Sequence, residues 1–146
     1  MISVYLIEYT DLQQAKDRIL LEYSRIKGNT YAVDYLPSGE PRLIANSMPN
    51  GYVSIGHTDG ILAMAFSDSK VGVDIERADR QVSSRVCESI EKWTRIEAYA
   101  KWTGRGLSRE MLAMHLPDEL ITTKTYRQLI VSLCADGNDF EIIELN

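Results

Sequence analysis

Apolar residues along this chain recur in short runs that are separated by turn-forming residues. Runs rich in β-branched and aromatic side chains predict strands at 2–9, 31–36, 52–57, 61–66 and 71–76, with a C-terminal set at 120–127, 129–136 and 140–145. Two other segments, 12–23 and 88–103, place apolar residues at helical spacing. Asp59-Gly60 and Asp136-Gly137-Asn138 are typical of tight turns. The second of these turns predicts an antiparallel arrangement of the C-terminal strands.

The order of these elements indicates a fold class. Strands outnumber helices, and neighbouring strands are joined by short turns, which favours an α+β fold with a largely antiparallel sheet. No linker rich in proline, glycine and serine divides the 146 residues. We therefore expect a single domain over residues 1–146.

Composition and charge narrow the class of protein. Hydrophobic residues make up 45% of the chain and charged residues 25%, as in ordinary soluble domains. No apolar run approaches the about 18 residues of a membrane span, and the first residues lack the basic start of a signal peptide. A net charge of −5 argues against nucleic acid as a partner. Cys87 and Cys134 lack metal-binding spacing, so we expect free thiols in a reducing cytoplasm. Since no apolar run is long enough to span a bilayer, we expect no membrane partner.

The predicted helix at 88–103 carries an acid within its apolar face. At about 100° per residue, Glu97 falls between Trp93 and Ile90, and Lys101 follows one turn later. One interpretation is a Glu–Lys ion pair in a structural or interaction protein, worth about 0.2–0.5 kcal/mol on an exposed surface. A carboxylate flanked by apolar groups, however, needs a partner that offsets its desolvation. A bound cation is one such partner.

The predicted strand at 71–76 carries two further acids. Asp74 and Glu76 are two residues apart, so both side chains leave one face of the strand about 6–7 Å apart, while Val73 and Ile75 point the other way. Taken alone, such a pair is more often a half-solvated strand face. Together with Glu97, it gives three carboxylates from two elements, a set that suits a hard divalent cation such as Mg²⁺.

The order of the motifs resembles a known family of enzymes. The motifs are G-E-P at 39–41, S-I-G-H-T at 54–58, V-G-V-D-I-E at 71–76 and W-T-x-x-E-A-Y-x-K-x-x-G-x-G-L-S at 93–108. Together they resemble a 4′-phosphopantetheinyl transferase of the surfactin-synthetase-activating type, and the resemblance covers most of the chain. It implies a 4′-phosphopantetheinyl transferase-like fold, in which two similar α/β halves, about 1–70 and 71–146, form a compact pseudo-dimer.

The resemblance also implies an activity. The family transfers the 4′-phosphopantetheine group of coenzyme A to a serine of an acyl or peptidyl carrier protein and releases adenosine 3′,5′-bisphosphate. Asp74, Glu76 and Glu97 match its Mg²⁺ ligands, with coenzyme A as co-substrate. Glu97 would also orient or deprotonate the serine hydroxyl, and Lys101 would contact phosphate. Glu97 and Lys101 are thus the implied catalytic residues.

The residues implied to bind coenzyme A match the family less completely. His57 matches a histidine that reaches the phosphates, although a histidine beside an Asp-Gly turn is more often a hydrogen-bonded turn residue. Arg18 matches a basic residue on the first helix. Glu40 replaces a phosphate-facing lysine, for which Arg42 would have to compensate, and Gly56 replaces a serine.

Further departures affect the carrier protein as well. Ile96 replaces a lysine, the segment before the first helix is short, and 77–92 is shorter than in larger members, which dock the carrier with an additional helix there. These losses predict weaker binding of both substrates. The alternative is a non-catalytic homologue that binds coenzyme A or a carrier protein. A homo-oligomer would restore missing contacts from a neighbouring subunit.

Overall fold

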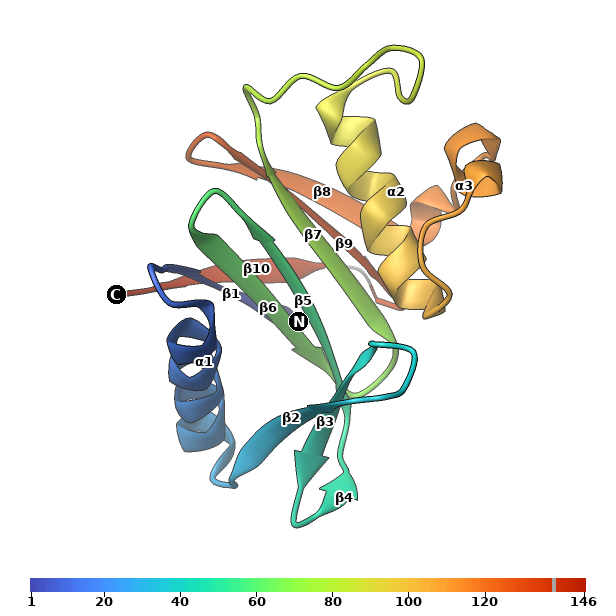
Figure 1. Ribbon diagram of the computed structural model, residues 1–146. Coiled ribbons are helices and arrows are strands. Elements are labelled where there is room, and N and C mark those ends of the chain that lie inside the picture. The colour runs from blue at the N-terminus through green and yellow to red at the C-terminus, as the bar shows by residue number, and fades with distance from the viewer. Residues whose placement is uncertain (138) are drawn as a thin grey trace.

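The computed structural model describes residues 1–137 and 139–146, which form an α+β fold with helices on two outer faces of its sheets (Figure 1). In chain order the elements are β1 (Ile2–Glu8), α1 (Leu12–Lys27), β2 (Tyr31–Tyr35), β3 (Pro41–Ala45), β4 (Met48–Pro49), β5 (Tyr52–Thr58), β6 (Ile61–Ser67), β7 (Val71–Arg77), α2 (Ile90–Thr103), α3 (Arg109–Ala113), the 3₁₀ helix η1 (Asp118–Leu120), β8 (Ile121–Tyr126), β9 (Leu129–Ala135) and β10 (Phe140–Leu145). The pairing is largely antiparallel, as the sequence predicts.

Most predicted elements form close to their predicted bounds. Helix α1 begins after Asp11, whose side chain accepts a hydrogen bond from the Gln14 amide, and ends at Gly28 with a φ of 70°. The hairpin of β5 and β6 turns at Asp59 and Gly60, with φ angles of 42° and 76°. Such left-handed pairs match the twist of the flanking strands. The short elements β3, β4 and α3 were not predicted, because their apolar runs are too brief for a periodic signal.

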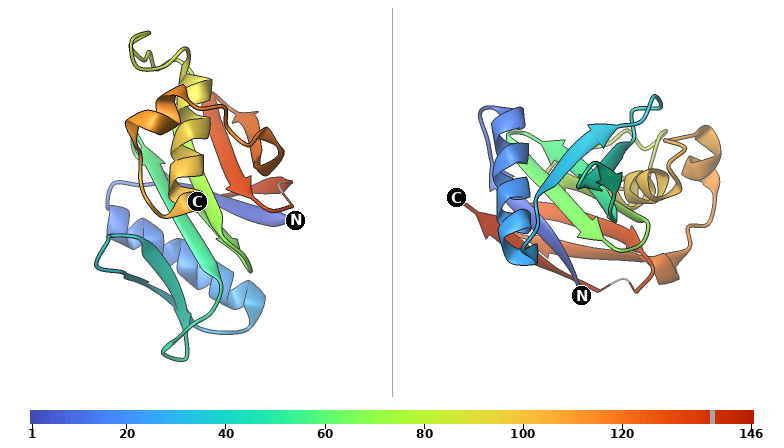
Figure 2. Two further views of the ribbon diagram at one scale, coloured as in Figure 1. Left: turned by 90° about the vertical axis from the view of Figure 1, so that its right-hand side faces the viewer. Right: turned by 90° about the horizontal axis from the view of Figure 1, so that it is seen from below.

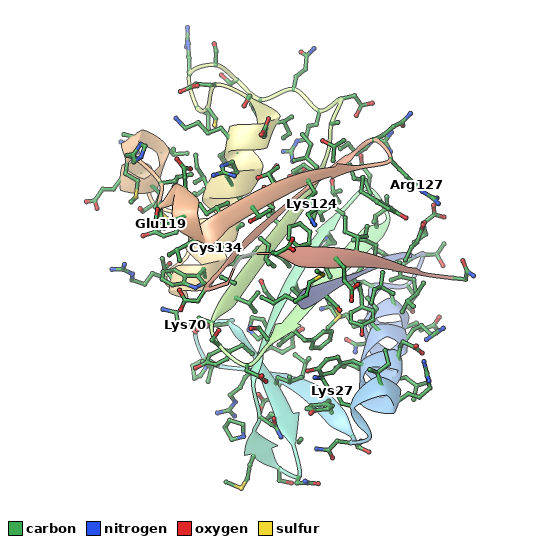
Figure 3. All side chains as sticks on the ribbon, turned by 180° about the vertical axis from the view of Figure 1, so that it is seen from behind. Lys27, Lys70, Glu119, Lys124, Arg127 and Cys134 are labelled. Atoms are coloured by element: carbon green, nitrogen blue, oxygen red, sulfur yellow. The ribbon has the colours of Figure 1, made fainter. Side chains whose placement is uncertain are left out.

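The C-terminal strands do not form one antiparallel set, so this part of the prediction is wrong. β9 pairs antiparallel with both β7 and β8, but β10 pairs in parallel with β1 in a different sheet. Lys124 on β8 donates a hydrogen bond to the Phe140 carbonyl of β10 (Figure 3). The intervening Gly137 has a φ of 63°, and Asn138 of the predicted turn lies outside the described residues. Phe140 is fully buried between the sheets, and burying it requires β10 to cross to β1.

Alternation of side chains along the strands divides the core into layers. The main sheets, β10–β1–β6–β5 and β7–β9–β8, enclose a central apolar cluster to which β1 contributes Val4 and Leu6. Tyr5 and Ile7 point the other way, toward α1. On the opposite side of the molecule, α2 covers the outer face of β7 and β9, where Cys134 is buried (Figures 2 and 3). Residue 70, near which the resemblance implies a boundary between two halves, belongs to the turn between β6 and β7.

Strands β5 and β7 belong to different sheets yet lie side by side through the middle of the molecule (Figure 1). The Val73 amide of β7 donates to Ser54 Oγ of β5 over 2.9 Å. Helix α2 packs directly on β7 at Gly72, where an added Cβ would lie 2.1 Å from the Ala98 carbonyl oxygen and 2.6 Å from the Trp102 nitrogen. A glycine at this position therefore allows α2 to approach β7 closely enough to place its polar face over the seam between β5 and β7.

Candidate functional site

The three acids predicted as metal ligands lie where α2 crosses β7. Val73 and Ile75 are fully buried in the central core, so Asp74 and Glu76 leave the opposite face of β7, and each is 7% exposed. Glu97 reaches the same place from α2 and is half-buried. Glu97 and Glu76 both act electrostatically on Asp74. The fold thus brings the three acids close enough to influence one another electrostatically.

Lys101 bridges strands β5 and β7, which belong to different sheets. Its Nζ atom donates to Asp74 Oδ1 over 3.1 Å and to the carbonyl oxygens of Ile55 and Val73 over 3.0 Å each. These three bonds use all three ammonium hydrogens. Glu97 is not within ion-pair distance of Lys101, so the expected Glu97–Lys101 pair is replaced by an Asp74–Lys101 pair. The interpretation of Glu97 and Lys101 as an ion pair is therefore wrong in its acid, because Lys101 pairs with Asp74.

Asp74 is the most perturbed acid of the site. Burial raises its pKa to about 6, against the opposing effect of Lys101, and the nearby Glu97 and Glu76 raise it further. Its Oδ2 atom is buried and has no hydrogen-bond partner among the described residues. An unpaired buried acceptor is costly. A proton or a cation would satisfy it.

Glu76 already has partners on both oxygens. Arg80 Nη1 donates to Oε1 over 2.5 Å, and Thr58 Oγ1 of β5 donates to Oε2 over 3.2 Å. The Glu97 carboxyl has no hydrogen bond to the described residues, and burial raises its pKa. Burial thus favours the protonated form of Asp74 and of Glu97, whereas both carboxylate oxygens of Glu76 are held by hydrogen bonds.

The donor set fits a divalent cation in its chemistry. It offers carboxylate oxygens from two elements, one of them the unpaired Asp74 Oδ2, which are the donors that Mg²⁺ prefers. In the present arrangement, however, no three His, Cys, Asp or Glu side chains of residues 1–137 and 139–146 form a group that could hold a metal ion. Lys101 and Arg80 take oxygens of Asp74 and Glu76 instead. Cation binding would need these two side chains to shift.

A cleft of about 400 Å³ opens beside Lys101. It lies between β5, the loop that joins β2 to β3, and the C-terminal end of α2, and the three acids lie behind Lys101 rather than in its wall. Lys16 and Lys70 bring two further positive charges to the lining. The Lys70 ammonium lies 4.3 Å from the centre of the Trp102 ring. The remaining lining residues are Tyr35, Ser38, Gly39, Glu40, Pro41, Tyr52, Val53, Ser54, Ile55, His57, Val71, Ala100, Gly104 and Gly106.

Trp102 lines the cleft and also carries a buried donor that no described residue satisfies. Its ring stacks on Tyr99 with centroids 6.0 Å apart, and its Nε1 atom is buried without a hydrogen-bond partner in the part of the chain that the structure describes. Glu40 brings the opposite charge to the same end of the cleft. Its carboxylate oxygens lie 3.0 and 3.1 Å from the position that a Cβ would take at Gly104. The cleft is thus basic near Lys101 and acidic at Glu40.

The residues predicted to contact coenzyme A are only partly placed in this cleft. His57 lines it, with Nδ1 3.3 Å from the Tyr9 hydroxyl. Arg18 pairs with Glu22 over 3.7 Å, and Arg42 forms two hydrogen bonds with the Asp34 carboxylate. Neither arginine lines the cleft, so Arg42 does not offset the acid at Glu40.

Several residues of the site carry no usable signal in the sequence. On α1 the cleft is lined by Lys16, which lies about 200° around the helix from Arg18. Lys70 belongs to the turn between β6 and β7, and Thr58 and Arg80 reach Glu76 only because of the fold. Trp102 is the exception, because its aromatic side chain near the end of a predicted helix could have been noted as a candidate wall of the site.

Comparison with known proteins adds no family assignment. No protein-family model matches the chain, and no curated protein matches its sequence. Among the described residues, no helix combines the length and the apolar character needed to cross a membrane.

Proposed function

We propose that this protein transfers the 4′-phosphopantetheine group of coenzyme A to a serine of an acyl or peptidyl carrier protein, with Mg²⁺ as cofactor. One observation carries the proposal. Asp74, Glu76 and Glu97, which the motif resemblance assigns to the metal, are separated in the chain but interact electrostatically behind Lys101, which lines the cleft.

The cleft suits part of a nucleotide-containing ligand. Its volume of about 400 Å³ falls within the usual range of small-molecule sites. Lys16 and Lys70 supply positive charge for phosphate groups, and Tyr35, Tyr52 and Trp102 supply aromatic surface for a base. In this arrangement the pyrophosphate of coenzyme A would lie toward Lys101 and the acids behind it.

The chemistry would depend mainly on Glu97. Burial raises its pKa, which makes it a stronger base than an exposed glutamate, and its carboxyl is free of hydrogen bonds to the described residues. It would accept the proton of the attacking serine hydroxyl. Bound Mg²⁺, held by Asp74, Glu76 and Glu97, would supply charge neutralisation at the pyrophosphate. Lys101 would leave its carbonyl partners to bind a phosphate oxygen.

A second candidate function is supported by the state of Lys101. All three of its donors are taken by protein acceptors, and Glu40 would repel a phosphate in the cleft. Both features favour a non-catalytic module that binds a coenzyme A-like molecule or a carrier protein without transferring the group. The two candidates differ in one measurable result, which is covalent modification of a carrier.

The deciding experiment incubates the protein with coenzyme A, Mg²⁺ and a panel of apo carrier proteins, followed by intact mass spectrometry of the carriers. Transfer adds the phosphopantetheine mass to one or more carriers, and Glu97→Ala removes this activity. Glu91→Ala, which changes an exposed acid of the same helix, keeps it. Calorimetric binding of coenzyme A without any modified carrier would support the binding module. No modification and no binding would refute both.

A further inference from the structure

Arg80 has an unexpected position for a residue of a loop. Its guanidinium donates to Glu76 Oε1 over 2.5 Å and also interacts electrostatically with Asp74 and Glu97. A single positive group thus interacts with all three acids. The Arg80 side chain is 51% exposed, whereas that of Glu76 is 10% exposed. The charge therefore covers the acids from the solvent side.

The backbone of Arg80 is fixed by the turn that follows β7. The Ala78 amide donates to the Gln128 carbonyl over 2.8 Å, and the Arg80 amide donates to the Arg77 carbonyl over 3.1 Å. Beyond this turn, residues 81–89 connect to α2 in an irregular path, with Cys87 buried against α2. The turn holds the start of the arginine side chain near the acids, while its half-exposed guanidinium can leave for water.

We propose that Arg80 acts as a built-in cation that competes with a divalent metal ion for the three acids. The inference rests on the proposed function, because it takes Asp74, Glu76 and Glu97 as the metal ligands. Arg80 is bonded to Glu76 Oε1 and lies close enough to Asp74 and Glu97 to act electrostatically with both. A metal ion that used this oxygen would lie next to the guanidinium, and two like charges a few ångström apart repel strongly in a partly buried site. Metal binding therefore requires Arg80 to leave.

Such competition lowers the apparent affinity for the metal. When only a fraction of molecules have the acids uncovered, the apparent dissociation constant rises by the inverse of that fraction. A half-exposed ion pair of this kind corresponds to a change in affinity of up to about fivefold. Removal of the Arg80 charge should thus tighten metal binding by this factor. The arginine would also protect the acids from mutual repulsion in the metal-free protein.

The test is isothermal titration of the protein with Mg²⁺, and separately with Mn²⁺, without coenzyme A or carrier. The variants are Arg80→Ala and the matched control Arg85→Ala. Arg85 is an exposed arginine in the same segment that forms no ion pair with the described residues. The control therefore changes the net charge equally but leaves Glu76 untouched. Circular dichroism at the start of each titration verifies that the variants are folded.

We expect Arg80→Ala to bind both metals more tightly than Arg85→Ala, by up to about fivefold. Arg80→Lys, which keeps the positive charge, should stay closer to the parent protein. Equal or weaker binding by Arg80→Ala overturns the competition while leaving the proposed metal site intact. If neither the parent nor any variant binds Mg²⁺ or Mn²⁺, the three acids are not a cation site, and the metal-dependent function fails with the inference.

Discussion

Substitution of Gly72 by alanine tests the packing that creates the site. The new Cβ would lie 2.1 Å from the Ala98 carbonyl oxygen and 2.6 Å from the Trp102 nitrogen. Both contacts are with the backbone of α2, so no side chain can rotate away to relieve them. The helix must move from β7 by roughly 1 Å, because close-packed interiors have no free space to take up the methyl group. Overpacking of this kind costs about 3 kcal/mol.

The same movement should disturb the site before it unfolds the protein. Lys101 Nζ lies 3.1 Å from Asp74 Oδ1, and a shift of about 1 Å would take this pair beyond hydrogen-bond distance. The Asp74 carboxylate would then lose a charged partner in a buried position, which adds to the cost. We therefore expect Gly72→Ala to lose stability through both packing and electrostatics.

Urea denaturation followed by circular dichroism measures the effect. Gly56→Ala is the matched comparison, because it adds the same methyl group on the adjacent strand. There the nearest atoms are the flexible Lys101 Nζ at 3.1 Å and the Val73 carbonyl oxygen at 3.2 Å. We expect Gly56→Ala to cost about 1 kcal/mol, clearly less than Gly72→Ala. Equal free energies of unfolding for the two variants, or a loss below about 0.5 kcal/mol for Gly72→Ala, would refute the close approach of α2 to β7.

Three further predictions concern the charged residues. Because burial raises the pKa of Asp74 to about 6, its protonated form is favoured by folding; its stabilising contribution is full below about pH 4 and is lost as the pH rises through about 6. The free energy of unfolding of Asp74→Asn, relative to that of the parent, should therefore rise by up to about 3 kcal/mol between pH 4 and pH 8 in urea titrations. A difference between the two proteins that does not change with pH would contradict the raised pKa. Glu97→Ala should lose transfer activity in the carrier assay while its unfolding free energy stays within about 1 kcal/mol of the parent, because this acid has no structural partner; transfer at the parental rate would exclude Glu97 as the base. Lys101→Met should lower the free energy of unfolding by about 2–3 kcal/mol at pH 8 and by less at pH 5, because Asp74 takes up a proton there in place of its lost partner. An equal loss at both pH values would show that the ammonium does not stabilise the Asp74 carboxylate.

The local elements were largely predictable because each carries its own signal. The period-two alternation of VGVDIE predicts Val73 and Ile75 in the core and Asp74 and Glu76 on the other face of the strand. The structure has this arrangement. Helix α1 ends at Gly28 because its left-handed conformation, with a φ of 70°, suits glycine. These features depend on residues that are adjacent or one turn apart. No long-range contact had to be known.

The partners of the charged residues were not predictable in the same way. Helical spacing places Lys101 one turn after Glu97, and the pair was one interpretation of the sequence. In the fold, Lys101 instead reaches Asp74 and two carbonyl oxygens of different sheets. A long flexible side chain takes the best acceptors within its reach, and those acceptors exist only after β5 and β7 lie side by side. The pairing of Arg80 with Glu76 has the same origin.

The sequence by itself determined the α+β class, the strands and helices near the site, and the placement of Asp74 and Glu76 on the strand face turned from the core. Only the tertiary structure decided that β10 joins β1 in parallel, that Lys16 rather than Arg18 lines the cleft, and that two basic side chains cover the acids. The physical reason is that hydrophobic periodicity is a local property of the chain. The partner of a charged side chain is set by distances between strands and helices. One such distance, between α2 and β7, is short because Gly72 has no side chain.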